Sequence, residues 1–570
     1  MNNDDISPRV FARRRHWQRF APQHPVDAVS ENRTIASITS SRSRTMMFIR
    51  VTLICVLIAV AVGVGTGGIG GMLSSRELVL GRAGSEVTSV WHLFRHLGGY
   101  SPWIPHHEKH GTGHDNDSGD TTIDMELPEE CTIDQVHMLS RHAERYPTLS
   151  VGIKMKKLVR RLREAVKKTS MLGTEGGVLD FLNDWELFFE VDEAARTSPH
   201  LELLTTRGQY AGTERAYASG VVLGRRYRHL LPDSIFGSNN ATAAIYSCSC
   251  DRVVSTADNF GRGFFGDDVF HNQIAHVIVS DNKAAGSPHS RGGDTLTPVK
   301  TCARYRADMV HGRSQGSAMA AVFKAGYLNR AAERLRPTLQ QRYGVELLPE
   351  DLWTMQEMCG FEILATGNHD APWCGLFTRQ EWEEFAYARD VLHYFRTGPG
   401  TPYSEVMGFL YLNATRELLE LGPTKFKSIY LSFAHDGDLV PLISALGLFS
   451  EAAPLPVSHL VPDRSWKLST VVPMGGRIVF ERISCANSIT ADRDIGVRLL
   501  VNDAVTRVPG CEHATLRGEI CPLQEYIDIV DRKGQQVGGF EEACGLDSEQ
   551  RRRPSFFEKE WTEAGRVHLE

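Results

Sequence analysis

An imidazole placed between two guanidiniums is the local pattern in this chain with the clearest chemical meaning. In the stretch DQVHMLSRHAERYPT, Arg141, His142 and Arg145 lie within five positions. Polar and apolar residues alternate before them, which predicts a strand, and a Tyr-Pro step ends that strand. Three potential cations would repel one another in a core, but together they can bind a doubly charged oxyanion such as phosphate.

Two further strand-like segments end in residues of the same kind. The apolar run ATAAIYSCSC is followed by Arg252, and the run SIYLSFA is followed by His435 and Asp436. Strands alternate here with helical patterns, which predicts an α/β sheet that is largely parallel. Ligands bind beyond the carboxyl ends of such strands, so these residues can converge with Arg141 and His142. Arginines, histidines and one carboxyl group, without metal-ligand spacing, favour phosphoryl transfer through a phosphohistidine.

The three motifs resemble those of the histidine acid phosphatases, the large-domain branch of the histidine phosphatase superfamily. RHAERYP is similar to the family signature RHGxRxP, HDGD to its downstream His-Asp motif, and a mid-chain SxxRV lies between them. The resemblance covers roughly residues 125–550 and includes, in particular, the fungal secreted acid phosphatases and phytases. It implies a phosphoglycerate-mutase-like three-layer α/β domain with a mainly helical cap, a small phosphorylated substrate, and neither a cofactor nor a metal.

The resemblance also implies a role for each residue of the predicted site. His142 would be the nucleophile that becomes phosphorylated, and Asp436 the proton donor that later acts as base for the hydrolytic water. The phosphate would be bound by Arg141, Arg145, Arg252 and His435. The nucleophile must be neutral, so we expect its other nitrogen to donate to a backbone carbonyl. The proton donor must be protonated when substrate binds, which favours acidic pH.

Two positions depart from the family pattern. Ala143 stands where the family usually has glycine, which is tolerable if that residue avoids a positive φ. Gly437 follows the His-Asp pair, where phytases typically have Asn and many acid phosphatases Thr. Acid phosphatase and phytase, acting on inositol hexakisphosphate, therefore both stay open. An inactive membrane-tethered phosphate-ligand binding protein is the alternative from another class, and the intact His142 and Asp436 argue against it.

The cysteines indicate an oxidising compartment. Of the eleven, Cys55 lies in an apolar segment and ten follow it, an even number that suits disulfides. The family resemblance suggests the pairs Cys131–Cys485, Cys302–Cys544, Cys359–Cys374 and Cys511–Cys521. Cys248 and Cys250 are left over, and because their spacing would strain a mutual bond, they are candidates for free thiols.

The N-terminal region predicts a membrane anchor. Residues 1–50 carry nine arginines against four acidic residues, a charge of +5, and are expected to form a disordered cytoplasmic tail. Residues 51–75 contain no charged residue, and their apolar first half predicts a transmembrane signal anchor. The arginines on its N-terminal side predict a single-pass type II protein of the secretory pathway, vacuole or cell surface, with a luminal or extracellular catalytic domain. A cleaved signal peptide, and hence a secreted enzyme, is the alternative.

The remaining organisation follows from composition. We expect a stalk over 76–130, the phosphatase domain over 131–550 with its helical cap at about 280–425, and a C-terminal tail over 551–570. The net charge of −6 leaves −11 outside the first fifty residues, which argues against nucleic-acid binding. Candidate glycosylation sites are Asn116, Asn240 and Asn413.

Three other patterns have a structural interpretation that we prefer. The stalk histidines His106, His107, His110 and His114 could bind a metal, but no flanking element would fix their geometry. The basic helix expected over 151–168 could draw anionic substrate to the cleft, but a solvated face is the simpler interpretation. The GNHD stretch resembles part of a dinuclear metallophosphatase motif, yet it lacks upstream partners and is expected to be a loop.

Overall fold

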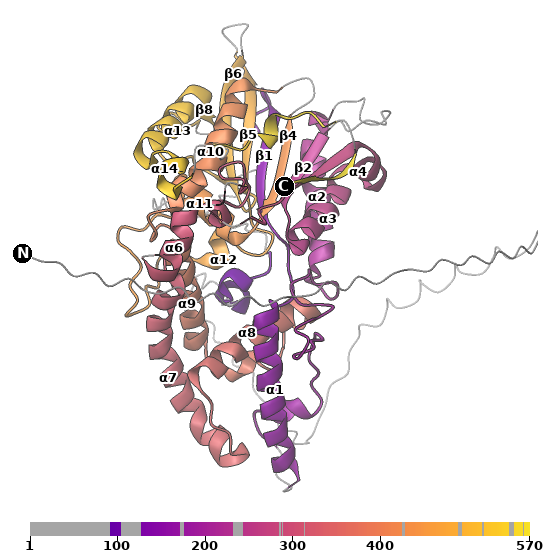
Figure 1. Cartoon of the computed structure of the whole chain (residues 1–570), viewed down its shortest axis with the longest axis vertical. Coiled ribbons are helices and arrows are strands. Elements are labelled where there is room, and N and C mark those ends of the chain that lie inside the picture. The colour runs from indigo at the N-terminus through magenta and orange to yellow at the C-terminus, as the bar shows by residue number, and fades with distance from the viewer. Residues whose placement is uncertain are drawn as a thin grey trace, which may run out of the picture. The chain divides into compact units, whose positions relative to one another are not determined.

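Strand β1 (Cys131–Arg141), which carries the first motif, lies inside a mixed sheet (Figure 1). Among the described residues the strand order is β7-β6-β5-β1-β4-β2-β3-β9, and β8 pairs with β6. The other strands are β2 (Ala243–Cys248), β3 (Ile274–Val279), β4 (Ile429–Ala434), β5 (Arg477–Ala486), β6 (Arg493–Val501), β7 (Ala504–Thr506), β8 (Cys521–Pro522) and β9 (Gly565–Leu569).

The computed structural model describes most of the chain after residue 91. The described ranges are 92–103, 127–171, 176–231, 243–283, 285, 287, 289–312, 314–423, 428–487, 493–515, 518–546, 552–561 and 564–570. All of them belong to one unit, Thr88–Glu570.

The sheet is parallel in one half and antiparallel in the other. Strand β4 pairs in parallel with β1 and β2, and β3 pairs in parallel with β2 and β9. Strand β5 is antiparallel to β1 and β6, and β6 is antiparallel to β7 and β8. The expectation of a largely parallel sheet is therefore wrong for the second half. Strands β5, β6 and β7 follow one another along the chain, and short connections join neighbouring strands as antiparallel hairpins.

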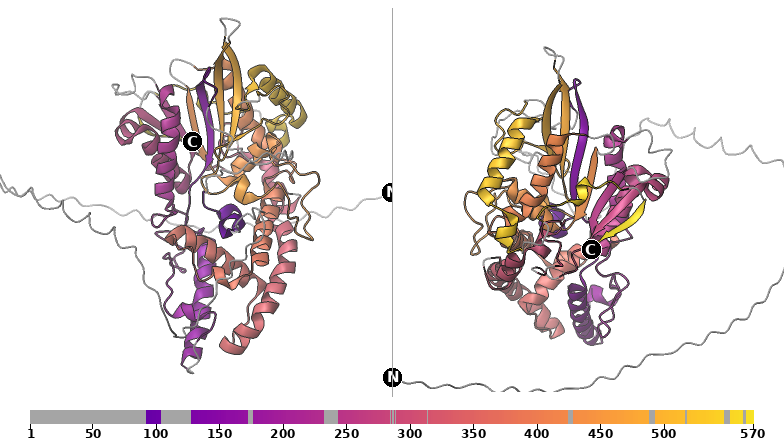
Figure 2. Two further views of the ribbon diagram at one scale, coloured as in Figure 1. Left: turned by 180° about the vertical axis from the view of Figure 1, so that it is seen from behind. Right: turned by 45° about the horizontal axis from the view of Figure 1, so that its top comes forward.

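Helices cover both faces of the sheet, which confirms the three-layer α/β class. One layer holds α2 (Gly212–Tyr227), α3 (Asp251–Phe265) and α4 (Asp267–Gln273). The other holds α10 (Ser404–Leu421), α11 (Asp436–Ala445) and α13 (Leu523–Val537), with α14 (Phe540–Cys544) beside α10 (Figures 1 and 2). Helices α10 and α11 approach closely because Gly408 has no side chain: a Cβ there would lie 2.0 Å from the carbonyl oxygen of Pro441.

A group of long helices lies at the carboxyl-end edge of the parallel strands, at the bottom of Figure 1. It is built from α1 (Leu149–Ser170), α7 (Gly316–Tyr343), α8 (Pro349–Thr366) and α9 (Arg379–Arg396). Shorter elements are α5 (Pro298–Thr301), α6 (Ala303–His311), α12 (Leu468–Val471), η1 (Leu93–His96), η2 (Gly98–Tyr100), η3 (Asp180–Asn183), η4 (Arg228–Leu230), η6 (Cys374–Leu376) and η7 (Phe556–Glu558). The cap is mainly helical as expected, but α1 joins it from outside residues 280–425. Helix α10 lies inside that range yet packs on the sheet.

Both ends of the expected domain need correction. Residues 92–103 were expected in the stalk, but Leu97, Tyr100 and Trp103 are buried, so this segment belongs to the folded domain. Residues 551–570 were expected to be a tail, but Phe556 and Phe557 are buried and β9 extends the sheet beside β3. Apolar side chains too sparse to form a recognisable pattern hold both segments in the core.

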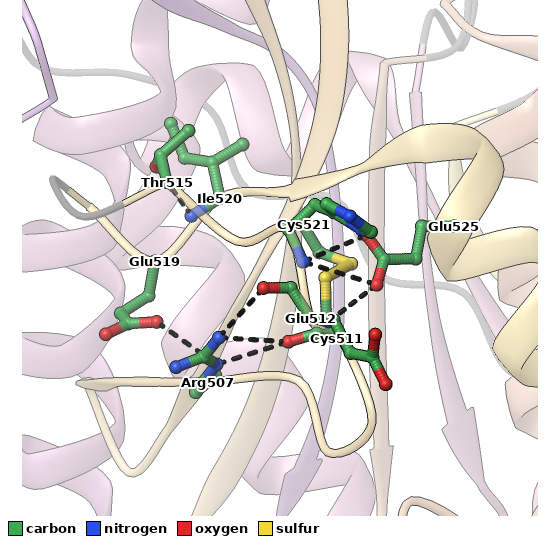
Figure 3. Close-up of a disulfide and its surroundings, with 9 residues drawn as sticks. Arg507, Cys511, Glu512, Thr515, Glu519, Ile520, Cys521 and Glu525 are labelled. Atoms are coloured by element: carbon green, nitrogen blue, oxygen red, sulfur yellow. Dashed lines mark hydrogen bonds and ion pairs between the residues drawn. A yellow bond between two sulfur atoms is a disulfide. The ribbon is translucent and has the colours of Figure 1, made fainter.

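The four suggested disulfides are present: Cys131–Cys485, Cys302–Cys544, Cys359–Cys374 and Cys511–Cys521. The last closes a loop beside β8 (Figure 3). Residues on either side hold that loop: the guanidinium of Arg507 donates to the carbonyl of Cys511, while the carboxylate of Glu525 accepts from the backbone of Glu512. Cys248 and Cys250 form no disulfide, as expected from the suggested pairing of the other eight cysteines.

Several predictions fall on residues outside the described ranges: the tail 1–50, the anchor 51–75, the stalk histidines, Asn116 and Asn240. Within the described ranges, every helix is too short or too polar to span a bilayer. Asn413 lies inside α10 and is half-buried, and its side-chain amide donates to Glu417 at 3.0 Å.

Candidate active site

The parallel strands bring the three sequence motifs together. Residues Arg141 and Ala434 are partners at the ends of β1 and β4, and the backbone of His142 donates to the Ala434 carbonyl at 3.1 Å. His435 follows β4 directly, so its ring lies 5.7 Å from that of His142, centroid to centroid. Strand β2 is the next neighbour of β4, and Arg252 in the first turn of α3 reaches the same place.

His142 has the geometry of a neutral nucleophile. Its side chain is buried, and its Nδ1 lies 2.9 Å from the carbonyl oxygen of Ala143. A carbonyl can only accept, so Nδ1 carries the proton and Nε2 keeps a free lone pair. Burial and the charges of Arg141 and Arg252 hold the pKa of His142 well below its ordinary value. Ala143 avoids a positive φ, so the methyl group that replaces the usual glycine is tolerated.

Three guanidiniums surround this imidazole. The Nη1 of Arg141 donates to the carbonyls of Gly99 and Val472, both at 2.7 Å, which fixes the group in place. Arg145 donates to the carbonyl of Tyr146 at 2.8 Å. The Nε atoms of Arg141, Arg145 and Arg252 are buried and have no partner among the described residues. Buried donors of this kind require an acceptor, and a phosphate offers several.

His435 and Asp436 begin helix α11. His435 is its N-cap, and its backbone donates to the carboxylate of Asp438 at 3.2 Å, which is one half of a capping box. The Nδ1 of His435 lies 3.4 Å from an Nη atom of Arg252. The residues of all three motifs are thus within reach of one bound anion.

A match to a family model explains why these motifs occur together. Residues 132–502 match the histidine phosphatase superfamily, branch 2. The chain belongs to this family. It is therefore a phosphoric monoester hydrolase.

Relatives and solved structures cover most of this phosphatase. It is 31% identical to the phytase PHO112 of Candida albicans, over 84% of this chain and 92% of that protein. It is 32% identical to the acid phosphatase PHO1 of Komagataella pastoris, over 80% and 87% of the two chains. The crystal structure of the phytase from D. castellii superposes with a TM-score of 0.66 at 27% identity, covering 82% of this chain and 90% of that one.

The carboxyl group of Asp436 lies between Arg141 and His393 in this phosphatase's site. Its Oδ2 is 3.5 Å from the Nη2 of Arg141 and 3.8 Å from the Nε2 of His393, while Oδ1 accepts from the backbone of Gly437 at 3.0 Å. Burial favours the neutral acid, but the charge of Arg141, the Nε2 proton of His393 and the charge of Arg396 outweigh it and hold the pKa of Asp436 well below its ordinary value.

Sequence reasoning missed two contributors to the site. His393 on α9 contacts Asp436, and Gly99 accepts from Arg141. A lone histidine in a helical pattern carries no signal of its own, and Gly99 contributes only a backbone carbonyl. The LGGYSPW segment around Gly99 could have been assigned to the domain from its aromatic residues.

Of the three patterns for which we preferred a structural interpretation, the basic helix and the GNHD stretch lie within the described residues, and their hydrogen bonds and ion pairs are away from this chemistry. In α1, Lys156 donates to the carbonyl of Val191, and Arg161 pairs with Asp351. The GNHD stretch is a loop after α8, as expected, and its His369 lies 3.0 Å from the side-chain oxygen of Gln209.

Proposed function

We propose that this phosphatase is an acid phosphatase that forms a phosphohistidine at His142. The observation that carries this assignment is the Nδ1 contact to the Ala143 carbonyl, because it leaves the Nε2 lone pair available in the middle of the arginines. In the first step Nε2 attacks phosphorus, the bond to the ester oxygen breaks, and the carboxylic acid of Asp436 protonates that oxygen. In the second step the Asp436 carboxylate takes a proton from water, the water oxygen attacks phosphorus, and phosphate leaves with His142 neutral again.

The phosphate would be bound by Arg141, Arg145, Arg252 and His435. Three guanidiniums can stabilise the charge on the equatorial oxygens throughout the transfer, and backbone carbonyls hold those of Arg141 and Arg145 in place. Because Arg141 holds Asp436 ionised in the free site, a bound phosphate dianion must weaken that effect before Asp436 can donate a proton. Substrate and proton are then taken up together, which favours acidic pH.

The test is to trap the intermediate. Wild-type protein quenched in alkali during hydrolysis of ³²P-labelled ester should retain label, because phosphohistidine survives alkali, whereas His142→Ala should retain none and be inactive. His459→Ala, at an exposed position, is the matched control and should behave as wild type. Full activity in His142→Ala would overturn the mechanism. Intact binding of inorganic phosphate by a wild-type chain without turnover would instead support the inactive binding protein.

Phytase activity is the second candidate, because one relative and one similar structure carry that name. Acid phosphatases and phytases differ in the part of the substrate beyond the reacting phosphate. Gly437, the second residue of α11, is a position at which this preference can be tested. A Cβ at Gly437 would meet only the Cγ2 of Thr397, at 3.9 Å, so a side chain at this position fits. Turnover of phytate against p-nitrophenyl phosphate at several pH values, by the wild type and by Gly437→Asn, would separate the two activities.

We also propose that residues 51–75 anchor the enzyme as a type II membrane protein with its catalytic domain in the secretory lumen or outside the cell. The uncharged apolar run, the arginines before it and four disulfides after it support this topology. Protease treatment of sealed microsomes should spare the chain after residue 76. Digestion of that part would contradict the topology, and its release in soluble form would favour a cleaved signal peptide.

A further inference from the structure

The two free thiols of the described chain lie against a phosphate-binding histidine. Cys248 is the last residue of β2 and is fully buried, and Cys250 is half-buried at the N-cap of α3. The Sγ of Cys248 lies 3.6 Å from the Nε2 of His435. One ligand atom each from Cys248, Cys250 and His435 lies within 4.8 Å of the other two. None of these contacts is needed for the phosphoryl transfer described above.

The spacing of these atoms suits a tetrahedral metal ion. With Zn–S bonds of about 2.3 Å and Zn–N bonds of about 2.0 Å, two ligands of a tetrahedron are about 3.5 Å apart. The distance between Cys248 and His435 is close to this value, and the Sγ of Cys250 lies within 4.8 Å of both. Two sulfurs and one imidazole favour a thiophilic cation such as Zn²⁺ over Mg²⁺ or Ca²⁺, which prefer oxygen.

The surrounding charges favour a thiolate at this place. The ammonium of Lys300 lies 3.6 Å from the Sγ of Cys250, where its positive charge would stabilise a thiolate. The other charged or titratable groups around the cluster are Arg252 on α3, His142 after β1, and Asp436 and Asp438 on α11. Thiolates and a neutral imidazole are the forms that bind metal.

We propose that Cys248, Cys250 and His435 form a site for Zn²⁺ or a similar thiophilic divalent cation, and that occupation of this site inhibits the phosphatase. Inhibition rests on the proposed role of His435. Metal binding at Nε2 requires the ring proton of His435 to move to Nδ1, so the guanidinium of Arg252, 3.4 Å away, can no longer donate to that nitrogen. The metal-bound ring also cannot carry the positive charge that attracts phosphate. Metal and phosphate therefore compete.

The metal site can be tested without any assay of activity. Co²⁺ added to the full-length protein should give a near-ultraviolet thiolate-to-cobalt charge-transfer band that saturates at one ion per chain, and Zn²⁺ should remove it. Cys250→Ser should lose the band or weaken Co²⁺ binding at least about tenfold, because one of three ligands is removed. His459→Ala should match the wild type. If Cys248→Ser fails to fold, Cys250→Ser alone decides, since its side chain is less buried.

The inhibition is tested with p-nitrophenyl phosphate. Zn²⁺ should inhibit the wild type competitively, and the inhibition constant of Cys250→Ser should be at least about tenfold higher while its hydrolysis without metal persists. Absence of a thiolate–cobalt band in the wild type, or equal inhibition of wild type and Cys250→Ser, would overturn the proposal. Metal binding without inhibition would overturn the link to His435. A chain that binds Co²⁺ through thiolates but hydrolyses no ester would contradict the proposed function and leave the metal site standing.

Discussion

The guanidinium of Arg141 lies 3.5 Å from the carboxylate of Asp436; Arg141 ends β1, and Asp436 lies just after the neighbouring parallel strand β4. Two backbone carbonyls hold the other terminal nitrogen of Arg141, so this cation cannot move away from the acid. The free site therefore keeps its proton donor ionised. A phosphate dianion bound to Arg141 supplies the opposite charge, and we expect it to raise the pKa of Asp436.

Replacement of the proton donor should discriminate between leaving groups. In Asp436→Asn, the kcat for an alkyl phosphate such as glycerol 2-phosphate should fall by about 10²–10⁴, because its alkoxide needs a proton as it leaves. p-Nitrophenyl phosphate should be slowed much less, since p-nitrophenolate leaves without one. Asp370→Asn, an exposed acid in the GNHD loop, is the control and should slow neither substrate. Equal slowing of both esters by Asp436→Asn would remove the assignment of Asp436 as general acid.

His393 should act as a positioning residue for the same carboxyl group. Its Nδ1 lies 3.5 Å from an Nη atom of Arg396, which can only donate, so the proton on Nε2 points toward Asp436 at 3.8 Å. We expect His393→Leu to reduce kcat for alkyl phosphates by about tenfold, with a smaller effect on p-nitrophenyl phosphate. His393→Gln, which keeps a donor, should restore part of the rate. A change in KM alone, equal for both esters, would contradict this role.

Removal of metal ions should not lower activity. Every group proposed to act on phosphate is a side chain of the protein, so dialysis against EDTA should leave hydrolysis of p-nitrophenyl phosphate unchanged in metal-free buffer. If trace zinc occupies the thiol site, EDTA should increase the rate in the wild type and not in Cys250→Ser. A loss of activity that added Mg²⁺ or Zn²⁺ restores would be incompatible with the phosphohistidine mechanism.

A buried ion cluster on β5, next to β1, should contribute strongly to the stability of the fold. Glu481 on β5 is fully buried and accepts from Arg226 at 2.7 Å, from Arg498 at 2.8 Å and from the hydroxyl of Tyr227 at 2.7 Å. Its removal leaves the buried guanidinium of Arg498 and the partly buried guanidinium of Arg226 without their counter-charge. We expect Glu481→Gln to lower the free energy of unfolding by about 3–5 kcal/mol near neutral pH, measured by urea denaturation. Glu420→Gln, in an exposed pair with Arg416, should change it by less than about 1 kcal/mol.

The same cluster predicts how the difference in the free energy of unfolding between wild type and Glu481→Gln depends on pH. Burial would raise the pKa of Glu481, but Arg226 and Arg498 outweigh it and hold this pKa below its ordinary value. A carboxyl group whose pKa is lower in the folded state stabilises the fold fully above its unfolded pKa, and this contribution is lost as pH falls through the folded pKa. The gap between wild type and Glu481→Gln should therefore narrow only under strongly acidic conditions. A gap that narrows between neutral and mildly acidic pH would contradict the lowered pKa.

The sequence predicted those parts of the site that lie directly after strands. Arg141, His142, His435 and Asp436 could be placed together because parallel strands end at one edge, and the register between β1 and β4 confirms this. His393 could not be predicted, because its helix belongs to the cap and its approach to Asp436 depends on how α9 packs. Long-range packing of this kind leaves no periodic pattern in the sequence.

The domain ends were mispredicted for a related reason. Composition assigns a segment to a linker when its apolar residues are few, as they are over 92–103 and 551–570. Burial depends instead on whether those few residues meet the core. The buried hydroxyl of Tyr100 donates to Glu357 at 2.9 Å. The two residues are far apart in the chain, so composition cannot detect this contact.

The C-terminal segment supplies a direct test of this point. The ring of Phe557 lies 5.0 Å from that of Tyr246 and 5.9 Å from that of Tyr411, and its side chain is buried. We expect Phe557→Ala to lower the free energy of unfolding by about 3–5 kcal/mol, because it removes a large ring from a packed aromatic cluster. Leu421→Ala, at a residue 71% exposed, is the control and should change it by less than about 0.5 kcal/mol. If urea unfolds Phe557→Ala and the wild type at the same midpoint, residues 551–570 do not belong to the folded core and the expected tail is correct after all.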